Sequence, residues 1–297
     1  MITQPIVVGV DGSPESVAAA SAAWMVADLA GVPCRLVHAA NDVSAALEFA
    51  GTGVATETLQ LAALSAARAR VSASLKNAVP GSVVDAMVVS IGTTAEVLEA
   101  VIRETDAALL VLGGKHHSTL GRWLGGSTVQ QVVRRVTIPL LVTAGELARR
   151  PRVMVAVDQS YAAMPAVDQA VAFARILGTP LHALHVVDRA PGIAELPPNW
   201  SRDIVERDIW PRIPLVEQGK VIREGAPFTV IVDEAVAWRA DVIVVGSHGK
   251  GWVDRMLIGS VTEDLLNNLP CAVLVVPVRK PERQRAPVPA TPEVAAG

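Results

Sequence analysis

The sequence predicts an α/β protein built from two tandem doubly wound parallel-sheet domains. Short Val/Ile/Leu runs alternate with Ala-rich amphipathic stretches along the chain, which is the pattern of successive β-α-β units. The apolar runs are nearly continuous, as expected for strands buried on both faces of a parallel sheet. The same order of segments occurs twice, so we expect two copies of one fold, each with about five strands.

The repeat is visible in matched segments. IVVGVDGS at 6–13 returns as VMVAVDQS at 153–160, which matches Asp11 with Asp158, 147 residues later. From the third strand onward the offset is 133, because the first copy carries 14 extra residues between its second and third strands. The predicted domains are therefore 1–147 and 148–280. The tail at 281–297 is rich in Pro and Ala and has no apolar period, so it is predicted to be disordered.

The elements of the first copy follow from these runs. Strands are expected at 6–10, 35–39, 85–89, 108–113 and 139–143, and helices at 13–31, 55–77, 93–106 and 127–136. Ser13 before Pro14 is a favourable helix start, and Gly31 is a favourable stop. In the second copy Pro211 and Pro214 interrupt the second helix, which leaves a short helix at 201–210.

Composition excludes several classes of protein. The formal charge of −3 supplies no basic field for nucleic acid or for an anionic membrane. Hydrophobic residues make up 51% of the chain, but the longest apolar runs have strand length, far short of the ~18 residues of a spanning helix. No signal peptide is recognisable, so a cytoplasmic location is expected. Cys34 and Cys271 lie in apolar segments outside any metal-binding motif and are predicted to be buried, reduced thiols.

A glycine constellation follows the fourth strand of the second copy. Gly246, Gly249 and Gly259 precede Ser260, at which a helix is expected to open. Glycines let backbone N–H groups approach phosphate oxygens, and a helix start adds free N–H groups and a positive dipole end. With the strand order 3-2-1-4-5, the crevice of such a sheet lies between strands one and four. Asp158 ends strand one, so its carboxylate and the glycines are predicted to form one pocket.

A purely structural interpretation stays open. Ser260–Glu263 and Ser127–Gln130 both fit a capping box, and glycines after strands often serve turns alone. Other nucleotide and hydrolase motifs fit worse. The GSHGKG stretch continues with Trp252 where a P-loop needs Ser or Thr, no GxGxxG follows strand one, and no nucleophile elbow is visible. His38 and His185 are expected to be hydrogen-bonded core residues.

The chain resembles the tandem universal stress proteins of actinobacterial type. GVD at 9–11, AVD at 156–158, LHVVD at 184–188, VVGSHGKG at 244–251 and IGSVTEDLL at 258–266 carry the resemblance, which covers nearly all of 5–277. It implies an adenine nucleotide alpha hydrolase-like fold and final strands that meet between the two copies. It also implies a bound adenine nucleotide, and the residues implied around it in the second copy are Asp158, Val186, Gly246, Gly249, Gly259, Ser260 and Val261.

The matching residues of the first copy are Asp11, Ala39, Gly113, Gly126, Ser127 and Thr128. One departure stands out in this copy, because His116 occupies the position of the second glycine. A side chain there blocks the phosphate cradle or adds a donor to it, so the first copy is either a second site or a vestigial one.

These observations favour an ATP-binding regulatory protein of the universal stress response, working by reversible binding rather than by turnover. The expected ligand is ATP or another adenine nucleotide, with Mg²⁺ accompanying the phosphates, and the expected assembly is a homodimer. Two alternatives remain. One is a nucleotide-free scaffold or dimerisation module, and the other is a slow ATP-hydrolysing enzyme of the same superfamily.

Overall fold

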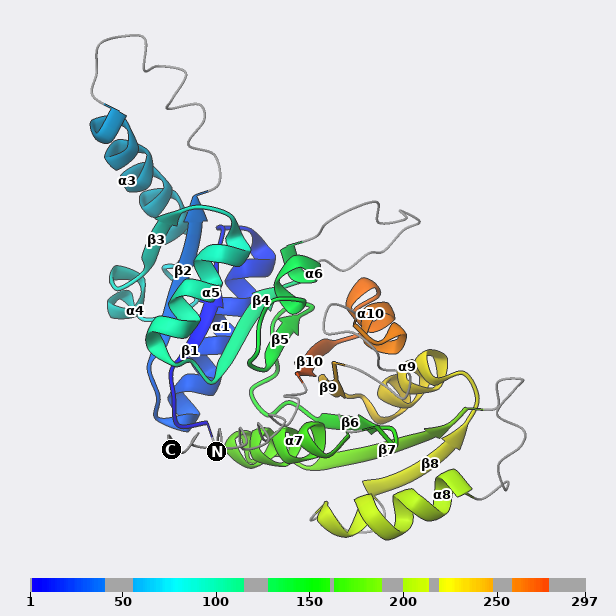
Figure 1. Ribbon diagram of the computed structural model, residues 1–297. Coiled ribbons are helices and arrows are strands. Elements are labelled where there is room, and N and C mark those ends of the chain that lie inside the picture. Colours follow the sequence, from blue (N-terminus) through cyan, green and yellow to red (C-terminus); the bar gives the residue numbers. More distant parts are fainter. Residues whose placement is uncertain are drawn as a thin grey trace, which may run out of the picture.

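Two five-stranded halves form one continuous sheet. The computed structural model describes residues 2–40, 56–114, 128–160, 163–188, 200–213, 219–247 and 258–277. Within these ranges ten strands follow the order β3-β2-β1-β4-β5-β10-β9-β6-β7-β8 (Figure 1). Both halves therefore show the predicted order 3-2-1-4-5, and the predicted fold class is confirmed. The tail at 281–297 lies outside the described residues.

The strands coincide closely with the apolar runs. In the first half they are β1 (Ile6–Gly9), β2 (Cys34–Ala40), β3 (Val88–Ile91), β4 (Leu109–Gly113) and β5 (Leu140–Thr143). In the second half they are β6 (Val153–Val157), β7 (Leu181–Val187), β8 (Lys220–Glu224), β9 (Val242–Gly246) and β10 (Ala272–Val276). The third strand was expected at 85–89 and begins later, because a short helix, α4 (Gly81–Asp85), uses the residues before it.

The two halves meet through their final strands, as the resemblance implies. All pairs within each half are parallel, whereas β5 and β10 pair antiparallel, with Leu141 opposite Leu274. These two residues match each other in the repeat, 133 positions apart. The antiparallel register is symmetric about this pair, so a pseudo-twofold axis passes between the two leucines.

The helices of the first half are α1 (Pro14–Ala30), α3 (Thr56–Leu75), α4, α5 (Thr94–Thr105) and α6 (Thr128–Val133). The start and stop predicted for α1 are confirmed. The Ser13 side chain accepts a hydrogen bond from the Ser16 N–H, and Gly31 ends the helix at φ 67°, a left-handed conformation that suits glycine. Helix α6 is shorter than the predicted 127–136.

The second half repeats this pattern with α7 (Ala163–Leu177), α8 (Trp200–Ile204), α9 (Pro227–Trp238) and α10 (Ser260–Asn267). The helix expected at 201–210 starts as α8, widens to a π-helix over Val205–Ile209 and ends in a 3₁₀ turn over Trp210–Arg212. Pro211 lies in that last turn, where its missing N–H stops a regular helix from continuing.

Helices cover both faces of the sheet and enclose two cores. Alternate strand residues point to opposite faces, so Ile6 and Val8 join one core and Val7 joins the other. Each core contains residues of both halves, because the sheet between them is continuous. Cys34 is buried and Cys271 is partly buried, and both are free thiols. Over the described ranges no helix is long and apolar enough to cross a bilayer.

Candidate functional site

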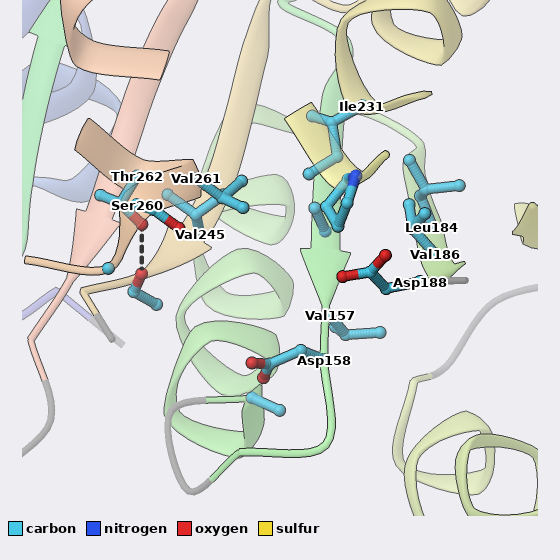
Figure 2. Close-up of a pocket in the computed structure, with 15 residues that line it drawn as sticks. Val157, Asp158, Leu184, Val186, Asp188, Ile231, Val245, Ser260, Val261 and Thr262 are labelled. Carbon is cyan, nitrogen blue, oxygen red and sulfur yellow. Dashed lines mark hydrogen bonds between the residues drawn. The ribbon is translucent and has the colours of Figure 1, made fainter. Parts of the chain in front are cut away.

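A cavity of about 230 Å³ lies at the carboxyl ends of β6, β7 and β9 in the second half (Figure 2). The starts of α7, α9 and α10 complete its walls. The residues that line it are Ala156, Val157, Asp158, Ala163, Leu184, Val186, Asp188, Pro227, Ile231, Val245, Gly246, Gly259, Ser260, Val261 and Thr262. Because β6 and β9 are neighbours while their crossovers diverge, the cavity occupies the switch point where open α/β sheets bind ligands.

The structure brings together six of the seven residues that the sequence suggested for this copy. They are Asp158, Val186, Gly246, Gly259, Ser260 and Val261. Gly249 lies outside the described residues, as do His248 and the other loop positions between 248 and 257. Segments about a hundred residues apart in sequence therefore face one cavity, and they come from four different elements or their ends.

Asp158 follows β6 and is held by the turn after it. Its Oδ1 atom accepts hydrogen bonds from the Ser160 N–H at 2.9 Å and from the Ser160 hydroxyl at 2.6 Å. Both bonds use the same oxygen, and Figure 2 shows the carboxylate beside the cavity. Such an Asx turn fixes the side chain before any ligand arrives.

A buried histidine holds the strand ends in place. His185 is fully buried, and its Nδ1 atom lies 2.8 Å from the Val157 carbonyl oxygen. Since a carbonyl can only accept, Nδ1 carries the proton and donates. His38 makes the same contact to Val10 in the first half, at 2.7 Å. The prediction that both histidines are hydrogen-bonded core residues is confirmed.

The start of α10 supplies hydrogen-bond donors to the cavity. The N-cap is Gly259, and the Glu263 N–H donates to its carbonyl at 2.9 Å. The helix therefore opens at Ser260 as predicted, but the alternative of a Ser260–Glu263 capping box is wrong, because Gly259 is the N-cap and Ser260 is already the first helical residue. The first N–H groups of a helix have no intrahelical acceptor, so those of Ser260 and Val261 are available to an anion in the cavity.

Two hydrogen bonds tie this helix start to the end of β9. The Thr262 hydroxyl donates to the Gly246 carbonyl at 2.8 Å (Figure 2). The Gly259 N–H donates to the Ser247 carbonyl at 2.9 Å. Thr262 is buried, so this bond holds the end of β9 and the start of α10 at a fixed separation.

The remaining walls are mostly apolar, and sequence reasoning missed several of them. Leu184, Val186 and Asp188 follow each other at intervals of two along β7 and its end, so they share one face. That alternation is the signal that could have identified Asp188. Pro227 and Ile231, one turn apart on α9, also line the cavity. Their presence depends on how α9 docks on the sheet, which no local pattern gives.

The cavity combines an apolar slot with donors at one end and carboxylates beside it. Such a slot suits a flat aromatic base, the α10 amides suit an anion, and Asp158 and Asp188 suit hydroxyl or amine donors. These two aspartates are the titratable side chains among the described lining residues. No group of three or more His, Cys, Asp or Glu side chains suited to a metal ion occurs in the described part of the chain.

The first half repeats this geometry in part. Asp11 Oδ1 accepts bonds from the Ser13 N–H at 2.9 Å and the Ser13 hydroxyl at 2.6 Å, as Asp158 does from Ser160. Partial burial would raise the pKa of Asp11, but the bonds from Ser13 and Ser16 outweigh it and hold the pKa below its ordinary value. Ala39 and Gly113 lie at the ends of β2 and β4, and Thr128 starts α6. Gly126, Ser127 and His116 lie outside the described residues.

Crowding distinguishes the first half from the second. A Cβ atom placed on Gly9 would lie 2.6 Å from Leu112 Cδ2 and 3.4 Å from Leu98 Cδ1. In the second half the matching residues are Ala156, Val245 and Ile231, all of which line the cavity. In addition, a Cβ on Gly113 would lie 2.5 Å from the Glu15 carbonyl, so this glycine is required for the packing of α1 on β4.

Comparisons with known proteins agree with the repeat. The sequence model described as the universal stress protein family matches residues 3–144 and 150–277. A universal stress protein of Mycobacterium tuberculosis is 30% identical over 294 residues, covering 91% of this chain and 96% of the relative. One of Mycolicibacterium smegmatis is 29% identical over 290 residues with the same coverage. Among solved structures, a universal stress protein from Archaeoglobus fulgidus has the same fold, with a TM-score of 0.62, 19% identity, and coverage of 92% of this chain and 98% of that chain.

Proposed function

Because the chain belongs to the universal stress protein family, we propose that it is a regulatory protein that binds an adenine nucleotide, principally ATP, in the cavity of its second half. The observation that carries this proposal is the meeting of six sequence-suggested residues in one cavity at the switch point of the sheet. Reversible occupancy would then report nucleotide supply to partners in the cytoplasm, with the chain acting as a homodimer.

The chemistry of the walls supports a place for each part of the proposed ligand. The base occupies the slot between Val186 on β7 and Ile231 on α9, where burial of an apolar ring face is favourable. The phosphates lie at the N-terminus of α10, beside Gly259 and Ser260. Asp158 accepts hydrogen bonds from ribose hydroxyls or from the base amine. Mg²⁺, which is bound in many sites through substrate phosphates, would enter with the triphosphate.

Binding without rapid turnover is the second part of the proposal. Hydrolysis needs a positioned base for the attacking water. Among the described lining residues the candidates are Asp158 and Asp188, and one oxygen of Asp158 already accepts two hydrogen bonds from Ser160. We therefore expect any ATP hydrolysis to be far slower than about 1 s⁻¹, the lower end of common enzyme rates.

The sharpest test is a charge change at the helix start. Gly259 has φ −61° and ψ 142°, an extended conformation open to any residue, and aspartate is a favoured N-cap. Gly259→Asp should therefore keep α10 folded while placing a carboxylate beside the phosphates. Two like charges about 4 Å apart repel by about 4 kcal/mol at an effective dielectric of 20, so ATP affinity should fall by at least about 100-fold.

Gly259→Asn is the matched control, because it has the same shape without the charge. It should retain most of the ATP affinity in calorimetry, and both variants should bind adenosine as the unchanged protein does. Equal ATP affinity of the Asp variant and the unchanged protein would reject the phosphate position.

Assay of small molecules released on denaturation separates the remaining functions. The proposal expects an adenine nucleotide among them, or ATP binding by the stripped protein. Finding neither would favour the alternative function of a nucleotide-free scaffold. For the first half alone, the crowding at Gly9 and the presence of His116 already favour that alternative. ATP turnover above about 1 s⁻¹ would favour the enzyme.

A further inference from the structure

The first half reaches the phosphate end of the proposed site through a pair of helices. Helices α6 and α10 lie side by side across the junction of the two halves (Figure 1). Two polar contacts join α6 and Arg134, the residue directly after it, to α10. The Gln130 amide donates to Asn267 Oδ1 at 2.7 Å, and Arg134 Nη2 lies 3.6 Å from Glu263 Oε1.

These two contacts are related by the pseudo-twofold axis. At the repeat offset of 133, Gln130 matches Glu263 and Arg134 matches Asn267. The two contacts are therefore the same pair of positions used twice. One contact is an ion pair and the other is a neutral amide pair, so a cation is present in only one of these two related contacts.

The ion pair lies at the end of α10 that faces the cavity. Glu263 is in the first turn of α10, directly after the cavity-lining residues Gly259 to Thr262. A carboxylate near a helix N-terminus stabilises the helix, but here it also brings a negative charge close to where phosphates would bind. Arg134 offsets that charge from the other half of the molecule.

We propose that Arg134 is a positioning residue for phosphate binding in the second half, acting through Glu263. The proposal rests on the proposed nucleotide site. The pair is about 40% exposed on each side, so its own contribution to folding stability should be small. Its effect on the binding of a triphosphate should be larger than its effect on folding. Loss of Arg134 removes the cation paired with Glu263, and the Glu263 carboxylate then repels nearby phosphates over a distance at which salt screens charges only weakly.

The test measures ATP and adenosine affinity of the full chain by calorimetry at low salt. Arg134→Gln should weaken ATP binding by about threefold to fivefold, the size expected of one charge near a helix terminus. Adenosine binding should not change, because adenosine carries no phosphate. The ATP effect should largely vanish at about 0.5 M salt, where charges are screened.

The chain offers a matched control and a rescue. Arg135→Gln removes the same charge from the next, exposed residue, and ATP binding should stay within about 1.5-fold of the unchanged protein. In Arg134→Gln/Glu263→Gln both charges are gone, and the ATP affinity should return. Glu263→Gln alone should bind ATP at least as tightly as the unchanged protein.

Several results would overturn the proposal. One is that the Arg134→Gln and Arg135→Gln variants bind ATP with equal affinity, and another is that Arg134→Gln weakens adenosine binding as much as ATP binding. A third is that the double variant does not regain ATP affinity, and a fourth is that Glu263→Gln binds ATP more weakly than the unchanged protein. If the unchanged protein binds neither ATP nor adenosine, the proposed function itself fails and this proposal fails with it. ATP binding that is insensitive to Arg134 rejects this proposal alone.

Discussion

Gly114→Ala should destabilise the junction between the two halves. Gly114 follows β4, and a Cβ atom there would lie 2.3 Å from Leu269 Cδ1 and 2.7 Å from Val142 Cγ1. Leu269 belongs to the second half and is 6% exposed. Contacts this short force side chains or backbone to move, and overpacking of a core costs typically 1–3 kcal/mol, so we expect a loss of about 2 kcal/mol.

A double-mutant cycle with Leu269 shows where the cost arises. Leu269→Ala alone should cost about 2–5 kcal/mol, through lost burial and the cavity it leaves. In the double variant the new methyl group enters that space, so the two costs should not add. We expect a coupling of at least about 1 kcal/mol, with some penalty left because Val142 stays in place.

Urea unfolding followed by far-UV circular dichroism measures these free energies. Gly81→Ala is the control, since a Cβ on Gly81 meets no atom within 4 Å and the residue is helical. That change should be neutral or stabilise by up to about 1 kcal/mol. A Gly114→Ala variant as stable as the unchanged protein, or a cycle additive within about 0.5 kcal/mol, would refute the packing described at the junction.

Three further predictions concern single groups. Thr262→Val removes the hydroxyl bond to the Gly246 carbonyl and should cost about 1–3 kcal/mol in urea unfolding, whereas Thr262→Ser should not. Burial raises the pKa of Cys34 to about 12 and, together with a nearby carboxylate, that of Cys271 to about 12; a disulfide reagent at pH 8 should label both only in denaturant. Partial burial opposes but does not cancel the hydrogen bonds that lower the pKa of Asp11, so this carboxylate stabilises the fold above about pH 4 and ceases to do so as pH falls through the lowered pKa. Asp11→Asn should therefore flatten the stability profile in that acid range, and an unchanged slope would contradict it.

The fold could be predicted largely because its signals are local. Unbroken apolar runs mark strands buried on both faces, and the two-copy pattern supplies the same evidence twice. Ser13 and Gly31 bounded α1 correctly because capping depends on single residues and their backbone angles. The five-residue α4 and the late start of β3 were not predictable, since so short a helix has too few turns for a periodic pattern and forms only through tertiary packing.

The residues of the candidate site also separate into those with a local sequence signal and those placed by tertiary packing. Residues at strand ends, such as Asp158 and Gly246, were predicted because parallel strands bring their carboxyl ends to one edge. Pro227 and Ile231 were missed because the docking of α9, not the sequence around them, places them at the cavity. The opening of α10 at Ser260 was predicted correctly, whereas the capping-box alternative failed, since Gly259 acts as N-cap without any side-chain hydrogen bond.

The junction of the halves explains why two fused copies can do what two separate chains cannot. In a symmetric homodimer each interface contact occurs twice with the same residues, so a cation near one helix start implies a cation near the other. In this chain Leu141 faces Leu274 on the axis, but Arg134–Glu263 on one side is matched by Gln130–Asn267 on the other. Fusion removed the symmetry constraint on these positions. The same absence of a symmetry constraint allows Gly9 to be closely packed by Leu112 in one half while the matching Ala156 lines the cavity in the other. Each half can therefore keep a different set of features.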